Sequence, residues 1–289
     1  MGNILVIGGT RFFGRKLVEL LLIDGHDVAI LTRGHAGNPF NDRVEHIIAD
    51  RLNKQALASA IEGRYFDIVY DNICYSPNEA IEFCEIFNGK IGKLVFTSTL
   101  STYVADGVEK AEADFNPYEY AIQLGDRNAF PYGEGKRLAE AVFYQHGAFP
   151  TVAVRFPMVV GEEDYTERLL YHVRRVQSGE PIHFLTTEAE MSFITADEAA
   201  AFLIWAGVAA VEGPFNATAN GTISLAELIA VIENVTGNEA NVVVGNRDTL
   251  SPYAIPTSWY MTNKKASDAG FTFSNLHDWL KPLIQILAK

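Results

Sequence analysis

Residues 3–22 read NILVIGGTRFFGRKLVELLL. An apolar run ends on Gly8, a short turn follows, and Gly14 then lies in a segment whose apolar residues recur at helical spacing. A turn between a strand and a helix can bind a pyrophosphate, because the amides and the dipole of the helix N-terminus face it. Gly8 permits the tight turn, and Gly14 lets helix and strand pack closely. The stretch therefore predicts a dinucleotide-binding βαβ unit at the start of the chain.

Short β-branched runs alternate with helix-length segments along the first half of the chain. Strands are predicted at residues 3–8, 26–34, 44–50, 66–73, 93–100 and 151–156. Helices are predicted between them, around residues 53–62, 78–88 and 134–146. Few charges interrupt the strands, which is typical of a parallel sheet buried on both faces. We therefore expect an α/β fold with a doubly wound parallel sheet in residues 1–157.

The second half of the chain has a different character. Its strand candidates are shorter and lie among helices, at residues 181–185, 191–195, 213–218 and 241–245. No proline-rich linker separates the two halves. We interpret residues 158–289 as a smaller substrate-binding lobe that is partly interleaved with the first domain.

Composition excludes several classes of partner and of site. The formal net charge is −13, although residues 1–51 carry equal numbers of basic and acidic side chains. An acidic surface repels phosphate backbones and anionic lipid, so we expect neither a nucleic-acid nor a membrane partner. Cys74 and Cys84 have no neighbouring metal ligands, which indicates neither a disulfide framework nor a metal site. With no signal peptide and no apolar run long enough to span a bilayer, we expect a cytoplasmic protein.

The end of the second strand bears on the coenzyme. An NAD site usually has an acidic residue there to bond the adenosine ribose, and this chain has Thr32 and Arg33 instead. Arg33, with Arg11 in the glycine turn, could pair with a 2′-phosphate. The alternative is that both arginines are simply solvated. The pattern favours NADP over NAD.

The segment YGEGK places Tyr132 and Lys136 one helical turn apart on one face of a helix. An ammonium beside a phenol lowers a pKa that is normally near 10, which makes tyrosine a usable proton donor and acceptor. The preceding stretch VFTSTLSTY, residues 95–103, is a strand that ends in hydroxyl residues, although it could also be an ordinary Ser/Thr-rich loop. A second pair, Tyr260 and Lys264, follows no such strand, and we interpret it as structural.

These motifs together resemble the extended short-chain dehydrogenase/reductase superfamily, in its NAD-dependent epimerase/dehydratase group, which has a Rossmann fold. GGTRFFG is similar to the group's GGTGFIG turn, with Arg11 in place of the middle glycine. FTSTLSTY, YGEGK and VAVRFPMVVGEED resemble later blocks of the family. The resemblance implies that Tyr132 and Lys136 are catalytic, and that Thr99 orients the substrate oxygen.

The resemblance also implies a set of coenzyme contacts that runs from the glycine turn to the segment after the sixth strand. Besides Arg11 and Arg33, this set comprises Gly8, Thr10, Phe12, Phe13, Gly14, Asp50, Arg51, Asn72, Ser98, Phe156 and Val159. Asp50 matches the family's aspartate that meets the adenine. A homodimer through the helices beside the active-site helix is implied as well.

The implied activity is an NAD(P)-dependent oxidoreductase or epimerase that moves hydride at a carbinol or ketone carbon of a sugar-nucleotide-like substrate. Leu100 and Ser101 stand where the family's dehydratases have Asp and Glu, which disfavours dehydration. Met158 replaces an asparagine that touches the diphosphate in several sugar-nucleotide epimerases, which weakens that assignment.

Two other functions stay open. One is an NADPH-dependent reductase of a small carbonyl compound. The other is a non-catalytic dinucleotide sensor or RNA-associated protein, because GGTRF and DIVYDN also resemble an atypical branch that includes plastid RNA-binding proteins. The acidic charge argues against the RNA alternative.

Overall fold

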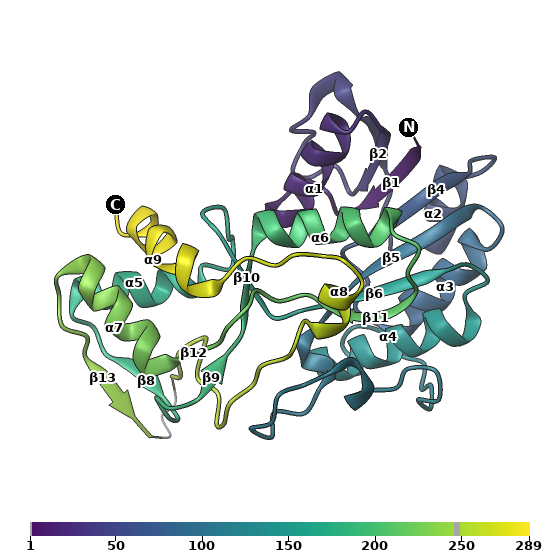
Figure 1. The fold of residues 1–289 in the computed structure, drawn as a ribbon. Helices are drawn as coiled ribbons and strands as arrows, with labels where there is room; N and C mark the ends of the chain where they lie inside the picture. Colours follow the sequence, from purple (N-terminus) through teal and green to yellow (C-terminus); the bar gives the residue numbers. More distant parts are fainter. Residues whose placement is uncertain (1, 246–248) are drawn as a thin grey trace. The chain divides into compact units, whose positions relative to one another are not determined.

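The computed structural model describes residues 2–245 and 249–289, which separate into two compact units. Unit 1 comprises Met1–Tyr103, Glu112–Phe156 and Asp197–Ala217. Unit 2 comprises Val104–Ala111, Pro157–Ala196 and Thr218–Lys289. Each unit is thus assembled from three separate stretches of the chain (Figure 1).

A seven-stranded parallel sheet forms the centre of unit 1 (Figure 1). Its order is β11-β6-β5-β4-β1-β2-β3. The strands are β1 (Asn3–Ile7), β2 (Asp27–Thr32), β3 (Glu45–Ile48), β4 (Phe66–Asp71), β5 (Ile91–Thr99), β6 (Thr151–Phe156) and β11 (Gly213–Asn216). β2 and β3 lie on one side of β1, and the later strands lie on its other side. The strand order therefore reverses between β1 and β4, which is the arrangement of a doubly wound nucleotide-binding fold. The predicted fold class is confirmed.

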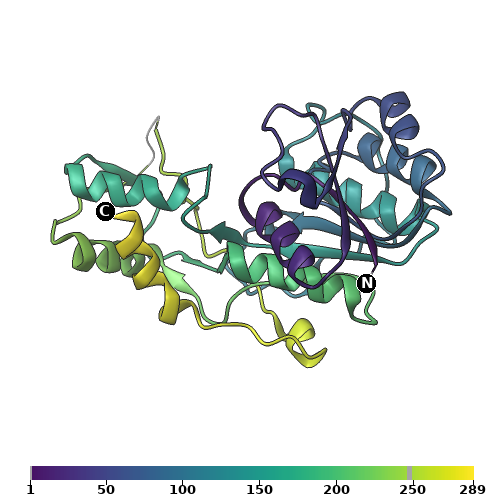
Figure 2. The same ribbon diagram turned by 90° about the horizontal axis from the view of Figure 1, so that it is seen from above.

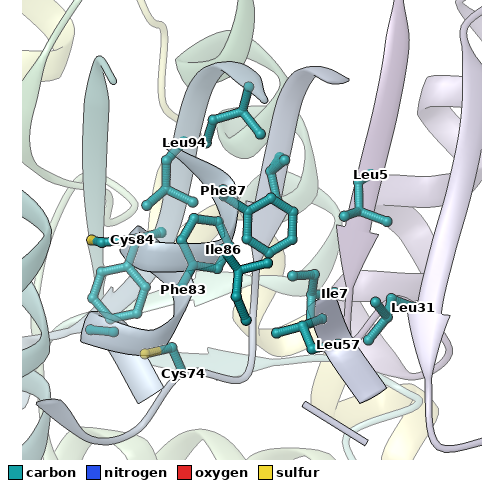
Figure 3. Close-up of a cluster of buried hydrophobic side chains, with 14 of the residues drawn as sticks. Leu5, Ile7, Leu31, Leu57, Cys74, Phe83, Cys84, Ile86, Phe87 and Leu94 are labelled. Carbon is teal, nitrogen blue, oxygen red and sulfur yellow. The ribbon is translucent and has the colours of Figure 1, made fainter. Parts of the chain in front are cut away.

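Helices cover both faces of this sheet. On one face lie α2 (Lys54–Ala60), α3 (Pro77–Phe87) and α4 (Tyr132–His146). Their apolar side chains join those of the strands in one buried cluster, to which α4 contributes Phe143. Figure 3 shows Leu57 and Phe83 of this cluster beside Ile7 and Leu31.

The opposite face carries α1 (Phe12–Ile23) and α6 (Ala196–Val208), which lie side by side in both ribbon views (Figures 1 and 2). Lys16 of α1 forms an ion pair of 2.7 Å with Asp197 of α6. Tyr70 of β4 packs against Gly207 of α6, where a side-chain carbon would overlap the phenol oxygen. Unit 1 is therefore a three-layer sandwich, as the alternation of strands and helices predicts.

Three short 3₁₀ helices, at Asn41–Arg43, Leu100–Thr102 and Glu112–Asp114, lie in the connections of unit 1. The segment after the last of these covers the outer side of α4. Tyr118 packs on Tyr144 with ring centroids 4.7 Å apart, and Gln145 donates hydrogen bonds of 2.9 Å to two carbonyls of this segment.

Unit 2 has a core of its own, built from helices. These are α5 (Arg168–Ser178), α7 (Leu225–Thr236), the short α8 (Lys264–Asp268) and α9 (Leu276–Leu287). Its strands form three pairs: β7 (Met158–Val160) with β10 (Phe193–Thr195), β9 (Glu190–Met191) with β12 (Ile223–Ser224), and β8 (Ile182–Phe184) with β13 (Val242–Val244). A capping box of Ser224 and Glu227 begins α7.

Two of the predicted strands of the second half differ from their expected form. Residues 191–195 divide between two strands, with Ser192 between them. Residues 213–218, expected among the short strands of the second half, contain β11, which pairs with β6 and extends the central sheet. Within the described residues, no helix combines the length and the apolar composition needed to cross a bilayer.

Candidate active site

The carboxyl edge of the sheet in unit 1 collects most of the predicted site residues. Because all seven strands are parallel, their carboxyl ends lie along one edge, where doubly wound folds bind their ligands. Gly8 follows β1, Arg33 follows β2, Asn72 follows β4 and Thr99 ends β5. The register brings the ends of neighbouring strands level, as in the pairing of Ile7 with Asp71.

The remaining predicted residues lie as follows. Asp50 and Arg51 come two and three residues after β3, and Ser98 lies near the end of β5. Phe156 ends β6, and its ring lies 5.8 Å from that of Phe13. Val159 is buried in β7 of unit 2.

The glycine turn has the geometry of an anion cradle. Gly8 has φ +85°, and a side-chain carbon on Gly14 would lie 2.7 Å from the Gly8 carbonyl oxygen. The N-cap residue Arg11 makes no side-chain hydrogen bond to the first turn of α1, and that turn holds no acidic residue. The positive end of α1 therefore faces the turn without a neutralising carboxylate, which suits a diphosphate.

The first turn of α4 lies directly against the segments that follow β4 and β5. A side-chain carbon on Gly133 would overlap the Ser101 carbonyl oxygen, and one on Gly135 would lie 2.5 Å from the Tyr75 carbonyl oxygen. Tyr132, the first residue of α4, is 52% exposed. Both glycines are visible in YGEGK, but the sequence carries no signal for these close contacts.

Gly133→Ala tests this close contact. Alanine normally stabilises a helical glycine position by about 1 kcal/mol. Here we expect a loss of about 1–3 kcal/mol in the free energy of unfolding, because the new methyl group meets backbone that cannot yield. Chemical denaturation measures it. His146→Ala, at the exposed end of the same helix, is the control and should change stability by less than about 0.5 kcal/mol. A stabilised Gly133→Ala variant would contradict the contact.

Thr99 lies beside this turn, at the end of β5. Its hydroxyl oxygen accepts a hydrogen bond of 3.1 Å from the Ser101 amide and so caps the short 3₁₀ helix that follows. Thr97, two residues earlier, donates a hydrogen bond of 2.7 Å to the side-chain oxygen of Asn72. Hydroxyl groups therefore line this end of β5, as the sequence predicts.

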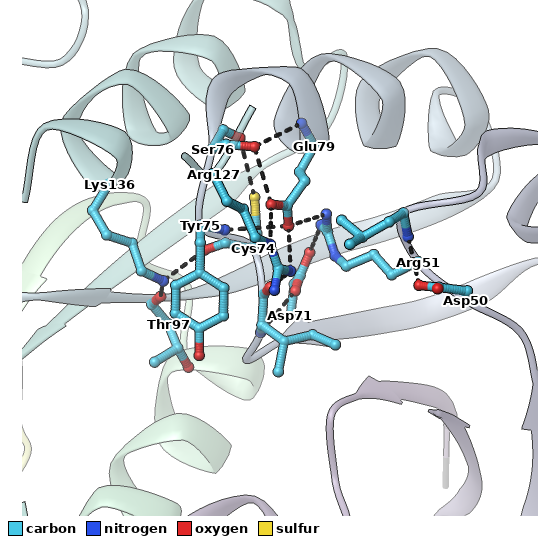
Figure 4. A network of polar contacts seen from close by, with 12 residues as sticks. Asp50, Arg51, Asp71, Cys74, Tyr75, Ser76, Glu79, Thr97, Arg127 and Lys136 are labelled. Atoms are coloured by element: carbon cyan, nitrogen blue, oxygen red, sulfur yellow. Dashed lines mark hydrogen bonds and ion pairs between the residues drawn. The ribbon is translucent and has the colours of Figure 1, made fainter. Parts of the chain in front are cut away.

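Lys136 is buried one helical turn beyond Tyr132. Its Nζ donates hydrogen bonds of 2.7 Å to the carbonyl oxygens of Cys74 and Thr97 (Figure 4). The rings of Tyr75 and Phe96 lie 4.5 and 4.7 Å from the same atom. Burial lowers the pKa of Lys136 to about 8, although nearby acidic groups oppose that shift. At neutral pH the side chain is a buried ammonium that loses its proton readily.

This burial makes stability depend on pH in a predictable direction. Since the pKa of Lys136 is about 8 in the folded state and near 10.5 when unfolded, the unfolded chain binds more protons between these values. The penalty for burying the charge is complete below pH 8 and disappears as pH rises to 10.5. We expect the unfolding free energy of the parent, minus that of Lys136→Met, to rise by about 3 kcal/mol across this window.

The measurement is urea unfolding at several pH values. Cys74→Ala should be present in both proteins, because burial raises the pKa of the Cys74 thiol to about 12 and that group would titrate in an overlapping range on unfolding. A difference that stays flat from pH 8 to 10.5 would contradict the assignment.

Ser98 points to the opposite face of β5 from Thr97 and Thr99. Its hydroxyl donates a short hydrogen bond to the Glu140 carboxylate of α4, and that carboxylate is paired with Arg155 of β6. All three side chains are buried. The Ser98 hydroxyl is thus engaged inside the fold.

A second buried network surrounds Arg51 (Figure 4). Its guanidinium pairs with Asp71 and, at 3.0 Å, with Glu79. Arg127 also binds Glu79, at 2.8 Å, and its guanidinium carbon lies 4.7 Å from the Tyr75 ring centroid. Burial alone would raise the pKa of Glu79, but hydrogen bonds from Arg127 and the charge of Arg51 hold it below its usual value.

Arg51 therefore lies inside the protein, with two carboxylates as partners, and its predicted coenzyme contact stays a prediction. By contrast, Arg11 and Arg33 are exposed, as is Asp50, whose carboxylate accepts a hydrogen bond of 3.0 Å from the Leu52 amide. Sequence reasoning did not single out Tyr75 or Arg127. For Tyr75, the signal in the sequence for a place in the site was its position shortly after the end of β4. Arg127 had no such signal.

Comparisons with known proteins agree with this geometry. Residues 4–78 match the model of the NAD dependent epimerase/dehydratase family, from β1 to the start of α3. This match confirms the family resemblance seen in the sequence, and the family's description is one of NAD-dependent enzymes. The comparisons do not assign the GGTRFFG variant to a branch of the family.

Two curated relatives are similar to most of the chain. One is the chloroplast stem-loop binding protein of 41 kDa b of Arabidopsis thaliana, 26% identical over 70% of this chain and 54% of the relative. The other is UDP-glucuronic acid decarboxylase 1 of Danio rerio, 25% identical over 69% of this chain and 50% of the relative. The chain spans about half the length of both relatives.

Among solved structures, the chain is similar to the UDP-glucose 4-epimerase of Thermus thermophilus, which was solved as a complex with NAD. The TM-score is 0.75 at 18% sequence identity, and the match covers 99% of this chain and 98% of the epimerase. This likeness shows that the fold is shared over the whole length.

Proposed function

We propose that this protein is an NAD(P)-dependent enzyme of the extended short-chain dehydrogenase/reductase type. It moves hydride at a carbinol or ketone carbon of a sugar-nucleotide-like substrate. The observation that carries the proposal is the placement of Tyr132 at the carboxyl edge of the sheet, one helical turn from a buried ammonium and against the segment that follows Thr99.

The residues of unit 1 fit a dinucleotide. A side-chain carbon on Gly8 would overlap Ile73, and one on Gly14 would crowd the Gly8 carbonyl, so the turn requires both glycines. The uncapped N-terminus of α1 faces this turn. We assign the diphosphate to this turn and the nicotinamide half to the edge near Thr99. When bound, the coenzyme supplies the carbon that accepts or returns the hydride.

The protein's own groups handle the proton. In the oxidising direction, the substrate hydroxyl gives its proton to the phenolate oxygen of Tyr132 as the carbinol hydride leaves. The Lys136 ammonium, one helical turn away, stabilises the negative charge on the phenolate. The Thr99 hydroxyl orients the substrate oxygen. Each step reverses when a ketone is reduced.

The same groups serve either an epimerase, which returns the hydride to the other face of the ketone, or a reductase, which releases the oxidised coenzyme. Sugar nucleotides are supported as substrates by two proteins to which this chain is similar, the UDP-glucose epimerase and the UDP-glucuronic acid decarboxylase. Leu100 and Ser101 disfavour dehydration, because they stand where the family's dehydratases have Asp and Glu.

For the coenzyme we propose NADP, bound through Arg33 and Arg11. Both arginines are exposed near the turn, where a 2′-phosphate would need a cation. Fluorescence titrations with NADPH and NADH are the test. Arg33→Asp should weaken NADPH more than NADH, whereas Lys90→Asp, which changes the charge equally but precedes β5 at the other edge of the sheet, should affect neither. An equal loss of both coenzymes in Arg33→Asp would refute the 2′-phosphate contact.

The overall proposal is tested by adding UDP-sugars to the protein with each coenzyme and following both the nicotinamide absorbance and the sugar products. Formation of an epimer or of reduced coenzyme with any of them supports it. A protein that binds neither NAD(H) nor NADP(H) would refute it.

A second candidate rests on the name of the Arabidopsis relative, a stem-loop binding protein. On that reading, the chain binds structured RNA. Titration of a labelled stem-loop RNA at two salt concentrations distinguishes the two functions, because contacts to phosphates weaken steeply with salt. Salt-sensitive RNA binding without coenzyme binding would replace the enzyme proposal. The net charge of −13 works against RNA binding.

A further inference from the structure

Tyr75 occupies a central place in the candidate active site that the assigned roles of Tyr132, Lys136 and Thr99 do not explain. It follows β4 and precedes α3. Its ring centroid lies 4.5 Å from the Lys136 Nζ and 6.0 Å from the ring centroid of Tyr132. In Figure 4 the ring lies beside the Lys136 ammonium, next to Thr97.

We propose that Tyr75 is a positioning residue, whose ring keeps the Lys136 side chain charged and packs against the ring of Tyr132. The inference rests on the proposed function, because it assigns to Tyr75 the support of the pair that handles the proton.

The physical reason lies in the surroundings of the ammonium. Lys136 is 1% exposed, so water does not solvate the charge. Of its three N–H donors, two bind the Cys74 and Thr97 carbonyls. The negative face of an aromatic ring stabilises a cation within about 6 Å, and does so most strongly where the cation is desolvated. The Tyr75 ring therefore stabilises the Lys136 ammonium and opposes the effect of burial, which favours loss of its proton.

The position of Tyr75 is itself held from three sides. Its amide donates a hydrogen bond of 3.3 Å to Glu79, and the Arg127 guanidinium carbon lies 4.7 Å from its ring centroid. Its carbonyl oxygen lies against Gly135 of α4 so closely that a side-chain carbon there would come within 2.5 Å. The buried ion pairs around Glu79 thus fix the backbone that carries the ring.

Other charged and titratable groups also act on Lys136, namely Asp71 of β4, Cys74 after it, Glu79 of α3 and Arg51 after β3. Arg127 lies over the Tyr75 ring, and Tyr132 and Glu140 belong to the same helix as Lys136. All of these groups are unchanged in the test below.

The test measures the Lys136 titration itself, by NMR of the full-length protein labelled with carbon-13 lysine, with Lys136→Met to assign the signal. The parent should titrate near pH 8. In Tyr75→Leu the midpoint should fall by about 0.4 to 1.5 pH units, because the cation–π contact is lost. Tyr75→Phe keeps the ring and should titrate close to the parent.

Two further proteins make the result decisive. Tyr118→Leu removes a tyrosine that packs on Tyr144 near the other end of α4, with no ring contact to Lys136, and should leave the midpoint unchanged. If Tyr75→Leu does not fold, trifluorophenylalanine at position 75 keeps the shape of the ring but weakens its negative face, and it should lower the midpoint relative to Tyr75→Phe. An unchanged midpoint in Tyr75→Leu or in the fluorinated protein, or a Tyr75→Phe midpoint as low as that of Tyr75→Leu, overturns the proposal.

This titration needs neither coenzyme nor substrate. A shifted midpoint in a protein that binds no coenzyme would support the role of the ring while refuting the proposed function. An unchanged Lys136 midpoint in Tyr75→Leu, in a protein that turns over a UDP-sugar, would refute the role of the ring while supporting the proposed function. For an active protein, the high-pH limb of kcat should move down with the Lys136 midpoint in Tyr75→Leu and return in Tyr75→Phe.

Discussion

Tyr132→Phe should lower kcat by a factor of about 10² to 10⁴ and leave the Kd for the coenzyme almost unchanged. The factor is what a positioned acid–base group contributes in general. Phenylalanine keeps the ring that packs against Tyr75 but has no oxygen to exchange a proton with the substrate. Because that proton moves only as the substrate reacts, kcat and kcat/KM should fall together.

Steady-state kinetics on the UDP-sugar found by the substrate panel, with coenzyme titration beside it, measures both quantities. Tyr260→Phe is the matched control, since Tyr260 also precedes a lysine by four residues but belongs to unit 2 and follows no strand that ends in hydroxyl residues. Its kcat should equal that of the parent. Full activity of Tyr132→Phe would remove Tyr132 from the mechanism.

Removal of either partner of the Arg155–Glu140 pair should lower the free energy of unfolding by about 3–5 kcal/mol. Neither side chain is exposed, and the guanidinium binds the carboxylate through two hydrogen bonds, of 2.6 and 3.1 Å. Arg155 also donates a hydrogen bond of 2.7 Å to the Tyr103 hydroxyl. A single substitution leaves a buried charge without its counter-charge, which costs far more than the pair itself contributes.

The experiment is a double-mutant cycle with Arg155→Met and Glu140→Leu, measured by urea unfolding. The double variant should be much more stable than the sum of the two single losses predicts, because no uncompensated charge remains. Arg174→Met in the exposed pair of Arg174 with Glu167 is the control, and its effect should be below about 1 kcal/mol. Additive losses in the Arg155–Glu140 cycle would show that the two charges do not depend on each other.

The sequence alone predicted the central sheet and its helices, because short apolar runs and glycine spacing specify these elements locally. The six predicted strands appear as β1 to β6, each within a few residues of its expected ends. Their apolar runs require burial on both faces, and the intervening helices satisfy that requirement. The close approach of Gly14 to the Gly8 carbonyl was likewise predictable, since the spacing of the two glycines specifies a strand, a turn and a helix.

Tertiary structure alone decided how distant segments and buried charges pair. The sequence GPFNAT predicts a short strand but not the sheet to which that strand belongs. In the folded chain it contains β11, which lies at the edge of the central sheet beside β6. YGEGK predicts a tyrosine and a lysine on one helical face, but not the two carbonyls and two rings that surround the Lys136 ammonium. In the same way, nothing in the sequence shows that Arg51 is buried and paired with Asp71 and Glu79.

The physical reason is the range over which each signal acts. Periodicity, glycine spacing and helical turns express the conformation of neighbouring residues, so a sequence read in order reveals them. The partners of a buried charge are the groups that pack beside it in three dimensions. For Lys136 they are the carbonyls of Cys74 and Thr97, and for Arg51 the carboxylates of Asp71 and Glu79, all of them distant in the chain. The sequence therefore determined the sheet and the placement of Tyr132 and Lys136 on one helix. Only the packing of α4 on β5 and on the segment that follows β4 decided the environment in which they act.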